Sequence, residues 1–117
     1  MSEPRLKSEI WVQAFIRRCW VADVPALLVR RGEETAGAVL IKANGFGNGC
    51  VVFARGMTVD GGWGWRRASG PNPVPEPDAD AYVERQLKFD PDLWVVEVES
   101  LALKDFVDDP VEESSRV

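Results

Sequence analysis

The stretch of residues 93–99 reads Leu93-Trp94-Val95-Val96-Glu97-Val98-Glu99. Successive side chains of an extended chain point to opposite faces, so Trp94, Val96 and Val98 share one face. The same alternation places Glu97 and Glu99 together on the other face. Because β-branched and aromatic residues predominate, we expect a strand that buries Trp94 in the core.

A helix is predicted directly before this strand. Residues 79–89 carry apolar side chains at helical spacing, and Asp78 precedes them as a candidate N-cap. The helix must end at Asp90, because a residue that precedes proline is driven out of the helical conformation. Residues 68–78 contain four prolines, which predicts an extended connector.

Four shorter apolar runs lie nearer the N-terminus, at residues 26–31, 37–43, 50–55 and 63–67. The connections between them are too short for crossover helices, which predicts a meander of antiparallel strands. Before them, residues 8–22 have the periodicity of an amphipathic helix. The predicted fold is an α+β two-layer sandwich in the order α-β-β-β-β-α-β. Its five-stranded sheet is mainly antiparallel, with both helices on one face.

The length of 117 residues fits one domain. We expect a single α+β domain over residues 1–109 and an acidic, disordered tail over residues 110–117. Within the domain, the glycine-rich residues 44–49 are open to two interpretations. A hairpin loop is favoured over a phosphate-binding loop, because the residues that follow form a strand and not a helix.

Histidine is absent from the chain, and its two cysteines, Cys19 and Cys50, lie in apolar stretches. Histidine is the usual proton shuttle near neutral pH and the commonest metal ligand, so its absence excludes Ser/His and Cys/His catalysis and the usual zinc sites. We therefore expect no catalytic residue, no metal and no cofactor. The sequence also shows no membrane span and no signal-peptide pattern, which predicts a cytoplasmic protein without membrane association.

Charge is divided along the chain. Residues 1–67 carry ten Lys and Arg against six Asp and Glu, whereas residues 68–117 carry four against thirteen. Mutual neutralisation of the two halves on folding is favoured over a basic surface for an anionic partner. The net charge of −5 argues against nucleic-acid binding.

The favoured function is a non-enzymatic protein-interaction or adaptor module. It would contact an unidentified protein through one sheet face or an edge strand. Trp63 and Trp65 are candidate anchors, because tryptophan is enriched at binding hot spots. Self-association is also expected, since an open sheet leaves edges.

The alternative function is a domain that binds an anionic small molecule through a basic patch on the sheet face. Arginine forks and a lysine suit phosphate or carboxylate groups, and a buried glutamate could serve an enzyme as a base. The candidate residues of this patch are Arg18, Arg30, Lys42, Arg66 and Glu97.

Several separated blocks of the sequence resemble the DUF1491 family, bacterial proteins of unknown function. These blocks are residues 5–12 (RLKSEIWV), 17–19 (RRC), 30–32 (RRG) with Gly37 and Lys42, and 89–94 (FDPDLW). The resemblance extends from about residue 5 to residue 109. It implies a cytoplasmic bacterial domain encoded as a stand-alone unit, and it implies no activity, substrate or catalytic residue.

Overall fold

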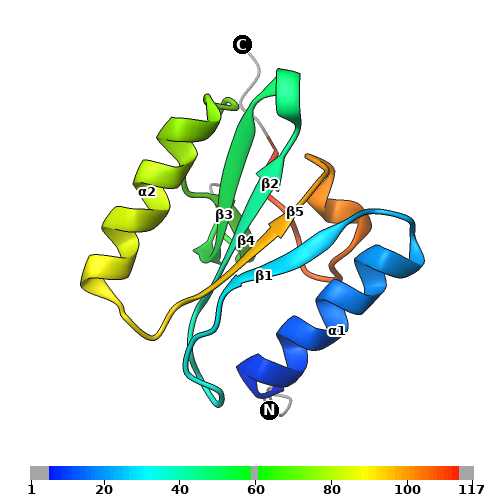
Figure 1. The fold of residues 1–117 in the computed structure, drawn as a ribbon, viewed down its shortest axis with the longest axis vertical. Helices are drawn as coiled ribbons and strands as arrows, with labels where there is room; N and C mark the ends of the chain where they lie inside the picture. The colour runs from blue at the N-terminus through cyan, green and yellow to red at the C-terminus, as the bar shows by residue number, and fades with distance from the viewer. Residues whose placement is uncertain (1–5, 59–60, 114–117) are drawn as a thin grey trace.

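The computed structural model describes residues 6–58 and 61–113. Within these ranges the elements follow the predicted order α-β-β-β-β-α-β (Figure 1). Their bounds are α1 Ser8–Val21, β1 Ala26–Arg30, β2 Val39–Asn44, β3 Cys50–Met57, β4 Trp63–Arg67, α2 Glu76–Phe89 and β5 Trp94–Val98. Two single-turn 3-10 helices, η1 Phe46–Asn48 and η2 Leu103–Asp105, lie in the connections. The predicted α+β class is confirmed.

The five strands form one mixed sheet in the order β1-β5-β2-β3-β4. Three neighbouring pairs are antiparallel, whereas β5 runs parallel to β2. The prediction of a mainly antiparallel sheet is therefore confirmed, but the simple meander is wrong at its first step. The strand β5 is apolar on both faces, so it takes an interior position between β1 and β2.

The two helices lie on opposite faces of the sheet, and the prediction that both share one face is wrong (Figure 1). The first face carries the predicted alternation of β5, and α1 covers it with Val12, Phe15, Cys19 and their neighbours. The second face is also apolar, and α2 covers it. This second cluster contains Leu40, Val52, Ala79, Val83, Leu93 and Val95. A sheet with two apolar faces needs a cover on each, so the molecule has three layers.

The start of α2 differs from the prediction, with Asp78 inside the first turn instead of at the N-cap, whereas α1 begins at Ser8 as predicted. The helix α2 begins at Glu76 and has Pro77 in its first turn, where the missing N–H of proline costs nothing. It ends before Asp90 as predicted. The hydroxyl of Ser8 does not cap α1 but donates to the carbonyl of Gly37, with an O···O distance of 2.6 Å. The segment 44–49 is a hairpin loop between β2 and β3, as favoured from the sequence.

Part of the predicted tail packs against the sheet. The backbone N–H of Trp65 donates to the carbonyl of Pro110, and the N–H of Glu112 donates to the carbonyl of Trp65. Gly64 makes this approach feasible, because a Cβ there would lie 2.3 Å from the Pro110 oxygen. Ordered packing therefore reaches beyond the boundary predicted at residue 109, and residues 114–117 lie outside the described residues.

In the described part of the chain, neither helix combines the length and the apolar character needed to cross a bilayer.

Candidate functional site

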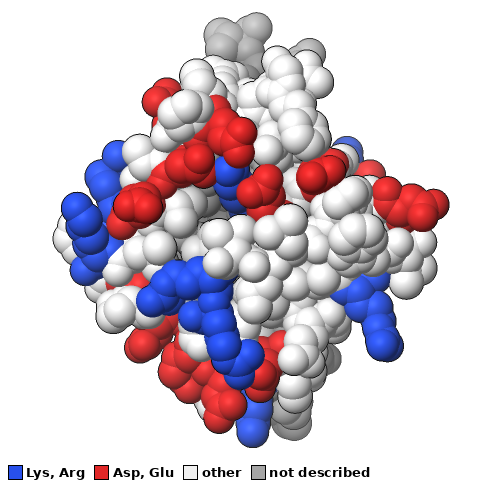
Figure 2. Space-filling model, viewed as in Figure 1, with Lys and Arg blue, Asp and Glu red and all other residues white. Residues whose placement is uncertain are grey.

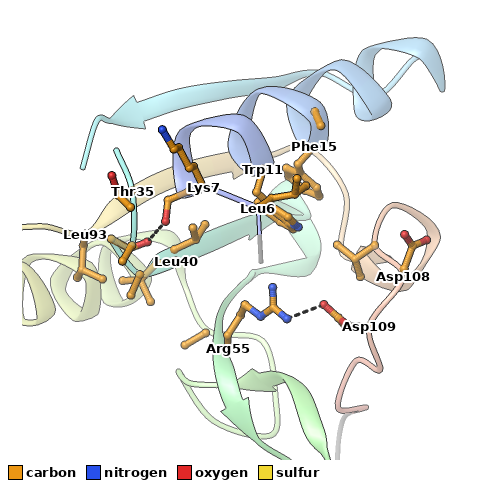
Figure 3. Close-up of a pocket in the computed structure, with 18 of the residues that line it drawn as sticks. Leu6, Lys7, Trp11, Phe15, Thr35, Leu40, Arg55, Leu93, Asp108 and Asp109 are labelled. Carbon is orange, nitrogen blue, oxygen red and sulfur yellow. Dashed lines mark hydrogen bonds and ion pairs between the residues drawn. The ribbon is translucent and has the colours of Figure 1, made fainter. Parts of the chain in front are cut away.

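An open cleft lies at the end of the sheet where the start of α1 and the end of α2 diverge (Figure 3). Its volume is about 1010 Å³, which is large enough for a small ligand or a short peptide segment. The walls come from six parts of the chain, which are α1 with the residues before it, residues 35–40, the end of β3, the start of β4, residues 86–93 and the segment 106–109. The cleft therefore exists only in the folded chain.

Aromatic side chains form much of the cleft wall. The rings of Trp11 and Phe15 stack with centroids 5.2 Å apart and an interplanar angle of 8°. Trp63 also lines the cleft and remains half exposed, whereas Trp65 is 0% exposed in the core behind Trp11. Of the two predicted tryptophan anchors, only Trp63 can contact a partner.

Arginines from two elements face the segment 106–109. Arg18 on α1 donates to the carbonyl oxygen of Phe106 at 3.1 Å and lies 3.5 Å from the carboxylate of Asp108. Arg55 at the end of β3 pairs with Asp109 at 2.8 Å (Figure 3). Since Asp108 is 92% exposed, its pair with Arg18 contributes little energy and can exchange for another anion.

The loop 32–37 forms another wall and is fixed internally by Glu33. Its carboxylate accepts the backbone N–H groups of Thr35 and Ala36 at 2.9 and 2.7 Å. These hydrogen bonds to the charged form lower the pKa of Glu33 below its ordinary value. The start of α1 holds the same loop, because the N–H of Ser8 donates to the carbonyl of Thr35.

This geometry predicts an acid-dependent loosening of the loop. A carboxyl group with a lowered folded-state pKa stabilises the fold above its unfolded pKa, and that contribution is lost as pH falls through the folded value. The amide resonances of Thr35 and Ala36 should therefore titrate with a midpoint below 4.5, the ordinary pKa of this side chain. The Glu33→Gln variant should lack this titration. A midpoint at or above 4.5 in the wild type would contradict the assignment.

A second cluster of charged groups lies on the α2 face of the sheet, around Lys42. The ammonium of Lys42 contacts Asp80 at 2.6 Å, Glu76 at 2.7 Å and Glu97 at 3.6 Å. Asn44 completes the cluster, because its amide donates to Glu97 at 3.1 Å and to Glu76 at 3.3 Å. Figure 2 shows basic atoms enclosed by acidic side chains between the start of α2 and the sheet.

The Lys42 cluster holds a permanent cation. Burial alone would lower the pKa of Lys42, but the hydrogen bonds that its ammonium donates to Asp80 and Glu76, together with the charge of Glu97, outweigh this effect and raise that pKa. The lysine is therefore protonated at physiological pH and cannot act as a base. Its side chain is only 7% exposed, and its ion pairs with Glu76 and Asp80 connect β2 to α2. We call this set of ion pairs the ionic clamp.

The four cations predicted to converge lie in different places. Arg18 reaches the cleft on the α1 side, while Lys42 meets Glu97 under α2. Arg30 donates to the carbonyl of Leu93 at 2.9 Å beside the edge strand β1. Arg66 is exposed on β4, opposite Ala54. A single basic patch cannot form, because Arg18 projects from the helix that covers one face and Lys42 points to the other.

The cysteines are poor nucleophiles. Burial raises the pKa of Cys19 to about 11 against the opposing charge of Arg18, and burial also raises the pKa of Cys50. Both thiols are free and buried. Across residues 6–58 and 61–113, no three side chains of the metal-binding types gather to hold an ion.

Arg55 and Trp11 are among the cleft residues that were not candidates from the sequence. Trp11 lies in the block of residues 5–12 quoted for the family resemblance, and Arg55 closes an apolar run with no motif around it. Only the pairing of β3 with β4, and of β4 with the C-terminal segment, brings Arg55 to Asp109. The sequence contains no local signal for this contact.

Comparison with solved structures gives matches over nearly the whole chain. The crystal structure of a DUF1491 family protein from Caulobacter crescentus CB15 has a TM-score of 0.78 and 39% identity, covering 92% of this chain and 100% of that one. The NMR structure of a DUF1491 family protein from the same organism has a TM-score of 0.74 and 39% identity, covering 95% and 100%. A solution structure of an A. tumefaciens protein has a TM-score of 0.68 and 30% identity, covering 92% and 99%.

The curated proteins contain no match to the chain. The family model described as "Protein of unknown function (DUF1491)" matches residues 6–108. Since this match spans most of the sequence and agrees with the resemblance of its separated blocks, the chain belongs to the DUF1491 family.

Proposed function

We propose that this protein is a non-enzymatic interaction module whose cleft binds an extended protein segment bearing an aromatic side chain followed by acidic residues. The observation that carries the proposal is the way the chain's own segment 106–109 lies along the cleft. Phe106 packs into the core, and Asp108 and Asp109 reach Arg18 and Arg55. A partner segment of the same chemistry would extend this contact toward the half-exposed Trp63.

The charged groups outside the cleft support binding over catalysis. Lys42 is held as a cation by three carboxylates, and both thiols have raised pKa values. These groups stabilise structure and offer no base or nucleophile near the cleft. As part of the same proposal we place the protein in the bacterial cytoplasm, because its relatives come from C. crescentus and A. tumefaciens and its cysteines are free.

One observation favours a small anion as a second candidate ligand. The Nε of Arg55 is buried and has no hydrogen-bond partner among the described residues, although Arg55 lines the cleft. An arginine with a spare donor suits a phosphate or carboxylate group. Such a ligand would contact Arg55 and displace Asp109.

The test uses a synthetic peptide with the sequence of residues 103–113 and the variant Asp108→Asn/Asp109→Asn, which frees the two arginines. Cleft amides should shift on titration, and Trp63→Ala in this background should weaken binding about tenfold, as expected for a hot-spot tryptophan. The matched control is Trp20→Ala, because Trp20 is similarly exposed but lies outside the cleft. Absence of binding, or equal effects of the two alanine variants, would contradict the proposal. Inorganic phosphate that shifts only signals around Arg55 would favour the second candidate.

A further inference from the structure

The two edge strands of the sheet, β4 and β1, differ in whether another segment pairs with them. The segment 110–112 pairs with β4 and covers that edge. The other edge is β1, whose strand partner in the described residues is β5 alone. An uncovered edge presents free N–H and C=O groups to any other strand. Within residues 6–58 and 61–113, one edge is therefore covered and the other has no further strand beside it.

The free backbone groups of β1 can be identified from its pairing with β5. The N–H of Glu99 donates to the carbonyl of Pro25, so the groups of Pro25 and Leu27 point toward β5 and those of Ala26 and Leu28 point outward. The register shifts between Leu28 and Arg30, which limits the regular outer edge to Ala26–Leu28. Trp20 flanks this edge and already satisfies the outward carbonyl of Ala26, because its indole N–H donates to that oxygen at 2.7 Å. Within the described residues, the outward groups that remain free are the N–H of Ala26 and the N–H and C=O of Leu28.

The open edge also exposes apolar side chains on both faces of the sheet. Leu27 is 49% exposed on the α2 side, where α2 does not reach, and Leu28 is 41% exposed on the α1 side. Val29 and Trp20 beside them are more than half exposed. Figure 2 shows a largely uncharged surface over β1, with basic side chains near one end and acidic side chains beyond the other. Natural edge strands usually carry lysine or proline, and Ala26–Leu28 has neither.

The charged residues at the two ends of β1 indicate which kind of strand could pair with this edge. Asp23 lies before β1, and its carboxylate has no cationic partner among the described residues. Arg30 ends β1, and its guanidinium donates to backbone carbonyls without a carboxylate partner in the same part of the chain. Two copies of β1 placed antiparallel bring the acidic end of each strand to the basic end of the other. The edge is thus complementary to itself.

We propose that the protein forms a two-fold homodimer in which β1 of one protomer pairs antiparallel with β1 of its partner. Leu27 faces its own copy, Ala26 pairs with Leu28, and Arg30 lies beside Asp23 of the other protomer. The pairing satisfies the outward N–H of Ala26 and both outward groups of Leu28, adds a second donor to the Ala26 carbonyl that already accepts from Trp20, and joins the two sheets into one continuous sheet. This inference is independent of the cleft, which lies at a different part of the molecule.

Sedimentation across a range of concentrations tests the proposal. The wild type should show a monomer–dimer equilibrium. Leu27→Lys should raise the dimer Kd roughly tenfold or more, because it sets two ammonium groups directly opposite each other. Asp23→Asn should raise it about threefold to tenfold through the loss of two exposed ion pairs, and asparagine tolerates the φ of 62° at this position. The control is Met57→Lys, which changes a side chain that is 60% exposed at the end of β3.

Amide hydrogen exchange gives a readout that does not depend on the variants. Exchange at Leu28 and Ala26 should slow as the protein concentration rises, while exchange at Leu27, already bonded to β5, should not change. A monomer at every concentration would overturn the proposal. So would a dimer that resists both Leu27→Lys and Asp23→Asn, because its interface would lie elsewhere.

Discussion

Replacing Trp65 with alanine is expected to lower the free energy of unfolding by about 3–5 kcal/mol, the range for truncation of a buried tryptophan. The side chain is 0% exposed, its ring lies 5.4 Å from that of Trp11, and the guanidinium of Arg55 lies over it at 5.4 Å. Removal leaves a cavity between α1 and the sheet. Since a domain of this size is stabilised by only about 5–15 kcal/mol, the variant should lose a large fraction of its stability.

The matched control is Trp63→Ala, which lies two residues away on the same strand. Trp63 is 50% exposed, so its loss should change the unfolding free energy by less than about 1 kcal/mol. Urea denaturation followed by circular dichroism compares the two variants. Equal losses of stability would show that the core does not extend behind Trp11 as described. Because Trp65→Ala disturbs the fold, only Trp63 is suitable for binding experiments.

The different burial of Trp63 and Trp65 shows that alternation along a strand predicts the face of a side chain but not its exposure. A period of two correctly placed Trp63 and Trp65 on one face, but it could not say how far along β4 the cover of α1 extends. Only the folded chain shows that Trp11 and Arg55 close over Trp65, while Trp63 lies beyond them at the cleft. Burial at a strand end depends on the neighbouring layer and not on the strand itself.

The sequence predicted the elements and the core face of β5 but not the arrangement of layers. The signal for a second covered face was present in Leu40, Val52 and Val95, which are apolar on the side opposite Trp94. The sequence did not show which two strands would be the neighbours of β5. Sequence order favours pairing of neighbours, and only the apolar character of both faces of β5 indicated an interior strand.

The sequence predicted only part of the Lys42 cluster and of the cleft, because their other residues are brought together by the arrangement of strands and helices. Lys42 and Glu97 were placed on a common face, and the parallel register of β2 and β5 sets them directly opposite each other. The carboxylates of Glu76 and Asp80 were not anticipated, because α2 was expected on the other face. The cleft itself was not predicted, although the candidate residues Arg18 and Trp63 line it, because its walls come from six separate parts of the chain.

Replacing Lys42 with methionine is expected to lower the free energy of unfolding by about 2 kcal/mol. Loss of one partner from a buried ion pair costs about 3–5 kcal/mol when the remaining charge is stranded. The cost is smaller here, because Glu76 and Asp80 are 50% and 56% exposed and keep part of their hydration. Glu97 is 20% exposed and bears most of the penalty, while methionine retains the packing of the lysine stem on the sheet.

The pH dependence of this loss follows from the direction of the pKa shift. The pKa of Lys42 is raised above 10.5 in the folded state, so its stabilising contribution is fully present below pH 10.5 and is lost as pH rises through the folded value. The difference in stability between wild type and Lys42→Met should therefore stay constant between about pH 7 and pH 10. Denaturation by urea at several pH values measures it. A difference that disappears in this interval would mean that Lys42 titrates and is not a permanent clamp.

A double-mutant cycle that combines Lys42→Met with Asp80→Asn separates the energy of this ion pair from the energy of apolar packing. Asp80 makes the shortest contact with the Lys42 ammonium, at 2.6 Å, and comes from α2, whereas Lys42 comes from β2. Residues in one ion-pair network couple by about 0.5–3 kcal/mol, and we expect a coupling near about 1 kcal/mol for this exposed carboxylate. Additive losses would show that the ion pair between Lys42 and Asp80 contributes nothing to stability. A clear coupling would establish that the buried Lys42 ammonium holds α2 against the sheet through Asp80.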